Sequence, residues 1–434
     1  MEIINTILEE WKEREFPEII EREFSIEKYT GSKVNKIIVL SGFRRVGKTY
    51  ILLNEIKKLL EKKDRKEVIY FNFEDERIPL KEDFLSGLFP GIIESNKKVP
   101  DYVFLDEIQN FPSWSKWLRR VYDMYPKTRF FVTGSSSKMT SNKIPTELRG
   151  RYLINRIFPL SFKEFLSFKS IKDASKHKLI GYFEEYVYCG GLPEIVLAEE
   201  NERAEIVKSY YSSVVNRDLI ETYSIRNKEA IKAILNLLLN STSYSYNKMY
   251  NSLKSLQYRI GKNTMIEYVS FIEDSFFMFS IPIFSYKVKD RMQYPKKNYF
   301  IDNIFISKIS SQFSNNYGRL YENLVAVHLL KQREDFFYWK NQKNEEVDFV
   351  LLKDKRVKLL IQVCYNINNA EALNREIRSL LKASKELKCR NLIILTKNEE
   401  KISEEEWFGI KRKIRFIPLW NICLSEEKLG GAKK

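Results

Sequence analysis

Cysteine and histidine are scarce in this chain, which holds four cysteines and two histidines among 434 residues. The cysteines are Cys189, Cys364, Cys389 and Cys423. No two of them are closely spaced, so reduced thiols fit the pattern better than a zinc ribbon or a disulfide framework. The two histidines are too few to suggest a catalytic triad. We therefore expect the chemistry to come from other residue types.

Long apolar runs are absent as well. No stretch reaches the roughly eighteen consecutive apolar residues that a membrane-spanning helix needs, and the first ten residues are too acidic for a signal peptide. These features predict a cytoplasmic protein without a membrane span.

Length and composition predict a protein with several packed domains. A hydrophobic share of 44% and an aromatic share of 14% are sufficient to form hydrophobic cores, and the length suggests about two to four domains. The 74 basic and 58 acidic residues give a net charge of +16, which permits binding to nucleic acid or another acidic surface. Because lysine and glutamate alternate along predicted helices, the charge alone does not identify a basic patch.

Residues 42–49, GFRRVGKT, match the phosphate-loop pattern. The apolar, β-branched segment 36–41 precedes them, and a helical pattern spans 50–60, so the motif lies between a strand and a helix. In this context the loop amides and Lys48 would bind phosphates, and the Thr49 hydroxyl would ligate magnesium. The residues expected to contact the nucleoside triphosphate are Gly42, Arg44, Arg45, Val46, Gly47, Lys48, Thr49 and Tyr50.

A second motif, 101–107, has an apolar strand pattern that ends in Asp106 and Glu107. In phosphate-loop ATPases such a strand ends beside the loop, and we expect the two motif strands to be adjacent in space. Asp106 would hold Mg²⁺, and Glu107 would orient and deprotonate the attacking water.

Further candidates follow the strand predicted at 128–133. Thr133 or Ser135 could contact the water or the γ-phosphate, although a serine-rich turn with local hydrogen bonds explains these residues equally well. Arg149 or Arg151 could neutralise the transferring phosphate, either within the chain or in a neighbouring subunit of a homo-oligomer, or each could be structural.

Together the loop, the FLDEIQ run at 104–109, the VTGSS strand end at 132–136 and the LRGR segment at 148–151 resemble a prokaryotic AAA+ ATPase family. The segments FPLSFKEF at 158–165 and GGLPE at 190–194 fit the same family. The resemblance implies an AAA+ ATPase core followed by a C-terminal domain of unknown function. Adenine as the base rests on this resemblance, because no Asn-Lys-x-Asp segment that would read guanine is present.

The middle of the chain favours a winged helix. Helices are predicted at 228–239, at 247–256 and from 261 onward, and strand-like sequence follows at 276–288 and 297–301. Lys262, Asn263 and Thr264 would lie in the first turn of a groove-reading helix. Because the same helix carries Glu267, which repels phosphate, DNA binding and protein contact both stay open.

The last part is similar to a restriction-endonuclease core, with a helix at 318–330, strands at 336–340, 346–352 and 359–365, a helix at 371–387 and a strand at 391–396. The resemblance implies a catalytic carboxylate on the helix, an aspartate at the strand start and a Glu-x-Lys on the next strand. Glu322 and Asp348 match the first two positions. Gln362 and Cys364 replace the last pair, and neither can take over the role of the residue it replaces. We therefore expect a degenerate centre without nuclease activity.

The sequence thus predicts an α/β phosphate-loop core at 1–165 with a helical lead-in at 1–30, whose second segment opens at Pro17. A helical linker at 166–223, a winged-helix module at 224–302 and a nuclease-like domain at 303–434 follow. The predicted function is Mg²⁺-dependent ATP hydrolysis coupled to conformational change on DNA or a protein partner. A nuclease regulated by ATP and a nucleotide-switched binding protein are the alternatives.

Overall fold

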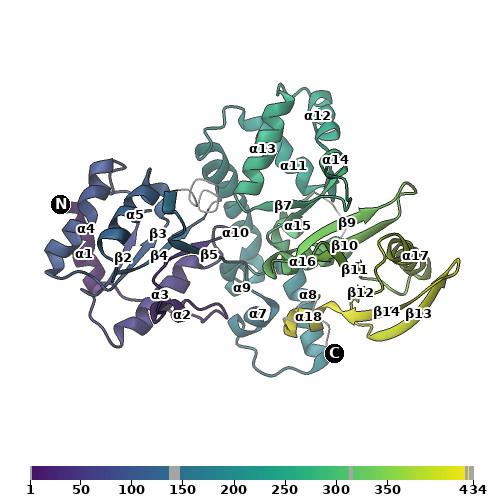
Figure 1. Cartoon of the computed structure of the whole chain (residues 1–434), viewed down its shortest axis with the longest axis horizontal. Helices are drawn as coiled ribbons and strands as arrows, with labels where there is room; N and C mark the ends of the chain where they lie inside the picture. Colours follow the sequence, from purple (N-terminus) through teal and green to yellow (C-terminus); the bar gives the residue numbers. More distant parts are fainter. Residues whose placement is uncertain (1, 136–146, 312–315, 426–428, 430–434) are drawn as a thin grey trace. The chain divides into compact units, whose positions relative to one another are not determined.

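The fold was obtained as a computed structural model that describes residues 2–135, 147–311, 316–425 and 429. The chain divides into two compact units (Figure 1). The first comprises Met1–Phe158 with Asp274–Phe276, and the second comprises Pro159–Glu273 with Phe277–Lys434. Among the described residues, no helix combines the length and the apolar character that crossing a membrane would require.

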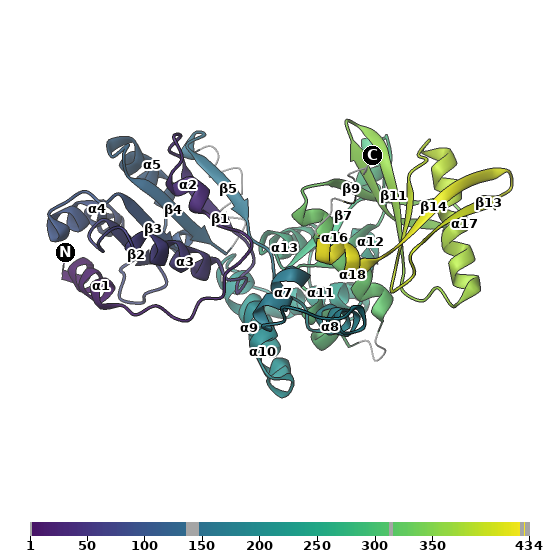
Figure 2. The ribbon, with the colours of Figure 1, turned by 90° about the horizontal axis from the view of Figure 1, so that it is seen from below.

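A five-stranded parallel sheet with the order β2-β3-β4-β1-β5 organises the first unit. Its strands are β1 (Ile37–Ser41), β2 (Val68–Asn72), β3 (Tyr102–Asp106), β4 (Arg129–Gly134) and β5 (Tyr152–Arg156). The helices are α1 (Glu2–Glu13), α2 (Glu27–Thr30), α3 (Lys48–Leu60), α4 (Glu82–Asn96), η1 (Ile108–Asn110) and α5 (Trp114–Met124). Figure 2 shows the strands of this sheet from below. The inner strand β1, between β4 and β5, is buried along its whole length, as a parallel strand covered on both faces must be.

The predicted parallel α/β core is confirmed, with one correction to its strand order. The sequence suggested that the two motif strands, β1 and β3, are adjacent, but β4 lies between them. Because all three strands are parallel, their carboxyl ends still meet at the same edge of the sheet. The small Gly134 at the end of β4 pairs with Ser41 at the end of β1.

The helix expected to open at Pro17 is also wrong over most of its length, because residues 14–26 form no helix and only the last turn before Gly31 is present, as α2. Tertiary contacts hold residues 14–26 instead. Phe16 packs edge-on against Trp11, and Ile26 is buried.

The second unit begins with a helical part. It consists of α7 (Phe162–Phe168), α8 (Lys176–Cys189), α9 (Pro193–Leu197), α10 (Glu200–Ser213) and the π-helical segment η3 (Val214–Glu221). The Gly190-Gly191 pair ends α8 at a close backbone approach. A Cβ on Gly190, whose φ is +74°, would lie 1.7 Å from the carboxylate of Asp302, and Gly191 N–H donates to the same carboxylate at 2.7 Å.

A small sheet with the order β6-β8-β7 follows. Its elements are α11 (Lys228–Leu239), β6 (Ser243–Tyr244), α12 (Tyr246–Ser255), α13 (Lys262–Asp274), β7 (Met278–Ile281), α14 (Val288–Gln293) and β8 (Lys296–Phe300). The three predicted helices are present. The strand predicted at 276–288 is present only over β7; beyond it Ile283 bridges to Tyr338, and α14 begins at Val288.

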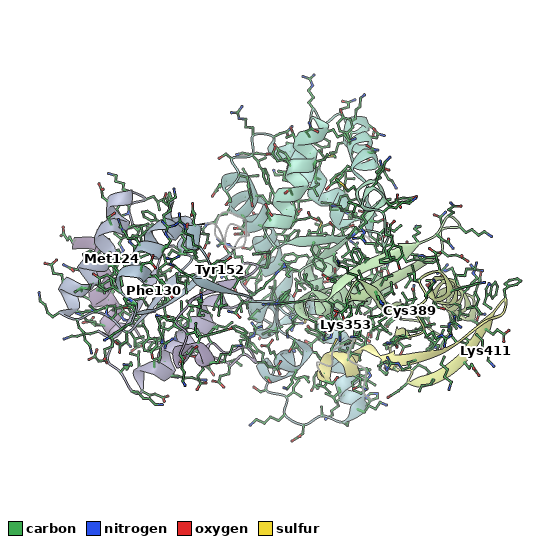
Figure 3. All side chains as sticks on the ribbon, viewed as in Figure 1. Met124, Phe130, Tyr152, Lys353, Cys389 and Lys411 are labelled. Carbon is green, nitrogen blue, oxygen red and sulfur yellow. The ribbon has the colours of Figure 1, made fainter. Side chains whose placement is uncertain are left out.

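A six-stranded mixed sheet with the order β13-β14-β12-β11-β10-β9 forms the last part. Its elements are α15 (Asn303–Ile309), α16 (Tyr317–Lys331), β9 (Asp335–Lys340), β10 (Glu346–Lys353), β11 (Arg356–Cys364), α17 (Ala370–Glu386), β12 (Leu392–Thr396), β13 (Lys401–Trp407), β14 (Ile410–Pro418) and α18 (Leu419–Ser425). The predicted order from α16 to β12 is present, whereas the β13–β14 hairpin was not predicted. The side chains of this part, among them Lys353, Cys389 and Lys411, are drawn in Figure 3.

Candidate nucleotide-binding site

The loop at 42–49 joins β1 to α3 and adopts the backbone that its glycines permit. A Cβ on Gly42 would meet the backbone oxygen of Ile157 at 2.3 Å, so only glycine fits there. Gly47 has a φ of 92° and precedes the first residue of α3. The amides of the first helical turn therefore follow directly on the loop, the arrangement that binds phosphate at helix N-termini.

Lys48 is buried beneath this loop, with 4% of its surface exposed. Its Nζ donates to the carbonyl oxygens of Gly42 and Phe43 at 3.1 and 3.2 Å. It also lies 3.5 Å from Glu107 Oε1. The ammonium thus links the loop to the carboxyl end of β3.

The carboxylates of Asp106 and Glu107 are held differently. Asp106 accepts hydrogen bonds from the hydroxyls of Tyr70, at 2.9 Å, and of Thr133 and Thr49. Burial and the neighbouring Glu107 charge raise the pKa of Asp106. Burial also acts to raise the pKa of Glu107, but the Lys48 charge and a hydrogen bond from Gln109 outweigh it, and the pKa is lowered.

Glu107 is fixed at both its backbone and its side chain. Its N–H donates to Thr133 Oγ1 at 2.8 Å, and its Oε2 accepts from Gln109 Nε2 at 2.5 Å. The backbone φ of Glu107 is 50°, a conformation that costs a non-glycine residue roughly 1 kcal/mol and is common at functional sites. Gln109 also donates to Ser135 Oγ at 3.3 Å, so both candidate hydroxyls lie in the same network as Glu107.

The remaining predicted contacts lie around the loop. Arg44 forms an ion pair with Glu74 at 3.4 Å, Arg45 and Tyr50 are exposed, and Val46 is buried. Of the residues expected to line the nucleotide, the loop glycines, Lys48 and Thr49 are thus brought together with the two acidic residues.

Arg149 and Arg151 do not lie at this edge of the sheet. Tyr152, the first residue of β5, pairs with Ile37, so both arginines precede the strand at the edge opposite the loop. Five strand residues span about 16 Å, and Arg151 Nε donates to Asp123 at 2.7 Å. An in-chain catalytic role for these arginines is therefore wrong; the role in a neighbouring subunit stays a prediction.

Three residues at the site escaped the sequence analysis. Arg22 donates to the carbonyl oxygens of Val46 and Phe158, at 2.7 and 3.0 Å. Tyr70 on β2 donates to Asp106, and Gln109 donates to Glu107. Of the three, only Gln109 could have been found from the sequence, because it lies two positions after Glu107 in the FLDEIQ run.

The residues present fit a magnesium nucleotide. A buried lysine, a threonine hydroxyl and an acidic pair converge on a glycine loop at a helix N-terminus, which is the donor set that triphosphates and Mg²⁺ require. The parallel sheet and this site define a phosphate-loop protein of the AAA+ ATPase-like class.

Comparisons with known proteins place the chain within that class. A family model described as "AAA domain" matches residues 34–166. Models of two domains of unknown function, DUF8612 and DUF4143, match residues 180–314 and 317–421.

An uncharacterized protein of Methanocaldococcus jannaschii is 38% identical over 407 residues, covering 90% of this chain and 89% of the relative. An uncharacterized protein of Haemophilus influenzae is 27% identical over 340 residues, covering 76% of this chain and 83% of that protein. The chain belongs to the family of the archaeal relative, and in this chain the AAA domain is followed by the two domains of unknown function.

Among solved structures, the chain resembles the Aeropyrum pernix ORC1 protein in complex with DNA, with 12% identity and a TM-score of 0.32 over 76% of this chain and 92% of that chain. It also resembles AMPPCP-bound DnaA from Aquifex aeolicus, with 13% identity and a TM-score of 0.29 over 63% and 86% of the two chains. These likenesses are too distant to support inferences about ligands.

Proposed function

We propose that the chain binds and hydrolyses ATP, and that the nucleotide state changes the conformation of the downstream domains. The observation that carries this proposal is the convergence of Lys48, Asp106 and Glu107 from a loop and a strand that are separated by β4 in the sheet. The four-part domain division and a cytoplasmic location, which suits the four free, buried cysteines, belong to the same proposal.

In this mechanism Lys48 exchanges its bonds to the Gly42 and Phe43 carbonyls for phosphate oxygens. Thr49 and Asp106 are the side chains that would hold magnesium, which neutralises charge on the phosphates when bound. Glu107 has a lowered pKa and is therefore ionised, as a group that orients and deprotonates water must be. Thr133 contacts both Asp106 and the Glu107 backbone, so it couples the two acidic residues.

Two variants test this function. Lys48→Ala should lose at least a hundredfold in ATP affinity, whereas Glu107→Gln should bind ATP normally and lose about a hundredfold or more in single-turnover hydrolysis. Lys57→Ala is the matched control, because Lys57 is exposed on the same helix α3. Normal ATP binding by Lys48→Ala would contradict the assigned site.

DNA is a second candidate ligand, for the winged-helix-like module. The segment between β7 and β8 exposes Tyr286 (73%) and Tyr294 (53%), together with Lys287 and Lys289. Lysines contact phosphates and tyrosines stack on bases. Lys262 and Asn263 are exposed at the start of α13, as a groove-reading helix requires.

Titration with duplex DNA at several salt concentrations tests this candidate. The double variant Lys287→Ala/Lys289→Ala should weaken binding and reduce the salt slope by about two. Salt-independent binding, or binding unchanged in the variant, would favour a protein partner instead.

A further inference from the structure

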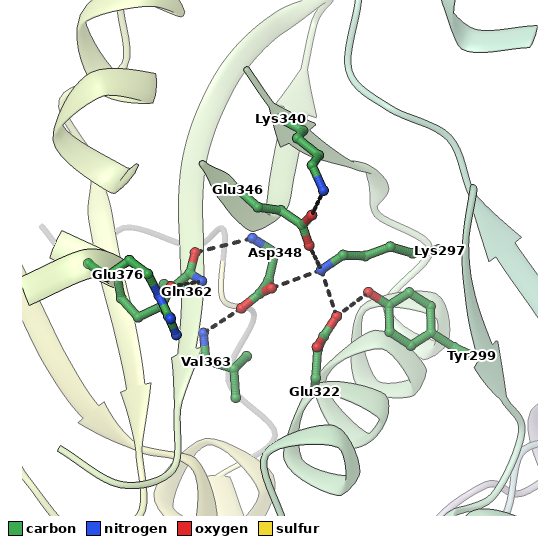
Figure 4. A network of polar contacts seen from close by, with 10 residues as sticks. Lys297, Tyr299, Glu322, Lys340, Glu346, Asp348, Gln362, Val363 and Glu376 are labelled. Carbon is green, nitrogen blue, oxygen red and sulfur yellow. Dashed lines mark hydrogen bonds and ion pairs between the residues drawn. The ribbon is translucent and has the colours of Figure 1, made fainter. Parts of the chain in front are cut away.

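Three carboxylates in the second unit converge on a single ammonium group (Figure 4). Lys297 Nζ on β8 lies 2.9 Å from Glu322 Oε1, 2.6 Å from Glu346 Oε1 and 2.9 Å from Asp348 Oδ1. Glu322 comes from α16, and the other two carboxylates come from the start of β10. Two of them, Glu322 and Asp348, are the residues that the nuclease resemblance singled out.

The hydrogen bonds of this ammonium are complete. A lysine ammonium has three N–H donors and no acceptor, and three carboxylate oxygens receive them. The Lys297 side chain is 6% exposed. Burial alone would lower its pKa, but the surrounding carboxylates raise it well above the ordinary value. The group is therefore a fixed cation that has no donor left to activate a water molecule.

The partners of the carboxylates fix them around this cation. Tyr299 donates to Glu322 at 2.7 Å, Val363 N–H donates to Asp348 Oδ2 at 2.9 Å, and Lys340 lies 3.2 Å from Glu346. The Gln362 amide does not reach the ammonium. It accepts from Asp348 N–H at 3.2 Å and donates to Glu376 at 2.6 Å.

The oxygen atoms surround a cation of ammonium size. Carboxylates from separate elements that meet at one point form the donor set that hard divalent cations take. The oxygens lie 2.6–2.9 Å from the nitrogen, whereas Mg²⁺ needs about 2.0–2.1 Å and Ca²⁺ about 2.3–2.6 Å. Accordingly, no group of three or more histidine, cysteine or acidic side chains in the described ranges is arranged to hold a metal ion.

We propose that the Lys297 ammonium is a tethered cation that takes the place of a divalent metal ion among Glu322, Glu346 and Asp348. The centre is then a structural joint between β8 and the C-terminal sheet, and it does not hydrolyse phosphodiesters. Lys297 does not act in place of the lysine missing at Cys364, because a lysine that assists a metal ion must leave the carboxylates free for that metal. Here the ammonium engages all three.

A second contact joins the same two parts and agrees with this role. Ile283 forms an isolated β-bridge with Tyr338 of β9, and Phe284 N–H donates to the Tyr338 carbonyl at 2.6 Å. A cleft of about 900 Å³, lined by Lys297, Glu346, Lys340 and Tyr338 among others, reaches one side of the centre. An ion from solvent therefore has a path to the carboxylates once the lysine is removed.

Lys297→Met tests the proposal in the nucleotide-free full chain, with Ca²⁺ as the probe because it needs the smallest inward movement of the oxygens. The substitution leaves buried carboxylates uncompensated and should lower the unfolding midpoint of the second unit by about 10 °C. Millimolar Ca²⁺ should restore most of that loss in Lys297→Met and leave the wild-type midpoint unchanged. EDTA should reverse the restoration.

Two control variants separate this role from general charge effects. Lys340→Met removes a 38%-exposed cation that touches only Glu346 of the three carboxylates, and it should gain no response to Ca²⁺. Lys297→Met/Asp348→Asn lacks a ligand and should lose the response. If Lys297→Met is recovered only unfolded, it should refold with Ca²⁺ and not without it.

Three results would overturn the proposal. One is the absence of any Ca²⁺ effect on the folding or stability of Lys297→Met. Another is Ca²⁺ binding by the wild type that Asp348→Asn abolishes. The third is Mg²⁺-dependent plasmid cleavage by the wild type that Asp348→Ala abolishes.

Discussion

Replacing Arg22 with methionine should weaken ATP binding although Arg22 lies outside the phosphate loop. The guanidinium donates to the buried Val46 carbonyl inside the loop and to the Phe158 carbonyl after β5. Hydrogen bonds from charged donors contribute about 1.5–3 kcal/mol each. Because Arg22 is partly exposed, we take the lower end, which gives a total of about 3 kcal/mol.

Part of that free energy should appear as weaker nucleotide binding, because a loop that is no longer held in place must be ordered by the ligand. Each 1.4 kcal/mol corresponds to a factor of about ten in affinity, so we expect ATP affinity to fall about tenfold to a hundredfold. Calorimetric titration with ATP measures this directly. Glu18→Gln, an exposed change in the same extended segment, is the matched control. Wild-type affinity in Arg22→Met would refute the reasoning.

Three further predictions concern other sites. Gly190→Ala should destabilise the second unit by more than about 2 kcal/mol, because φ is +74° and the new Cβ would overlap Asp302. Thermal unfolding measures this loss. A change within about 0.5 kcal/mol, the range of ordinary surface substitutions, would contradict the packing. Burial raises the pKa of Asp302 to about 7. When a carboxyl has a higher pKa in the folded than in the unfolded protein, the protein loses stability as the pH rises from the unfolded pKa to the folded pKa. The free energy of unfolding should therefore fall between about pH 4 and 7, by up to about 4 kcal/mol. Urea titrations should show a smaller fall for Asp302→Asn. Arg151→Ala should leave ATP affinity unchanged where the chain is monomeric, because Arg151 precedes β5 at the edge of the sheet opposite the loop. A tenfold loss of affinity in the monomer would contradict that placement.

The sequence was most informative where a motif fixes backbone geometry. The loop at 42–49 and the strand that ends in Asp106 and Glu107 could be placed because glycines, a buried strand pattern and a helical pattern all indicated the same arrangement. The order of the strands could not be read, since hydrophobic patterns report burial and not neighbours. The position of β4 between β1 and β3 could therefore not be predicted from the sequence.

Contacts between side chains from distant segments could not be predicted either, because hydrophobic patterns do not report which segments are neighbours. Arg22 lies in a segment whose composition favours a helix, and tertiary contacts, among them those of Arg22 with the Val46 and Phe158 carbonyls, hold the segment out of that conformation. Lys297 stands in a short strand of ordinary composition, where nothing separates it from its neighbour Lys296. Its role emerged only once β8 was placed beside α16 and β10.

The β13–β14 hairpin shows a limit of a different kind. Three glutamates on one strand face three basic residues on the other, Glu404 with Lys413 and Glu406 with Lys411 among the pairs. This charged part of the hairpin, 404–406 with 411–413, lacks the apolar alternation that predicts a strand, because cross-strand charge pairs take over part of the role of burial. The alternation appears only further along β14, where Ile414 and Phe416 are buried.

The central claim is that Glu107 acts on the attacking water of an ATPase site. Single-turnover hydrolysis of ATP by the wild type and by Glu107→Gln, with ATP binding measured in parallel, tests it most directly. The account predicts Mg²⁺-dependent hydrolysis by the wild type and a variant that binds ATP with unchanged affinity but retains it uncleaved. Equal hydrolysis rates in the two proteins would contradict the assignment.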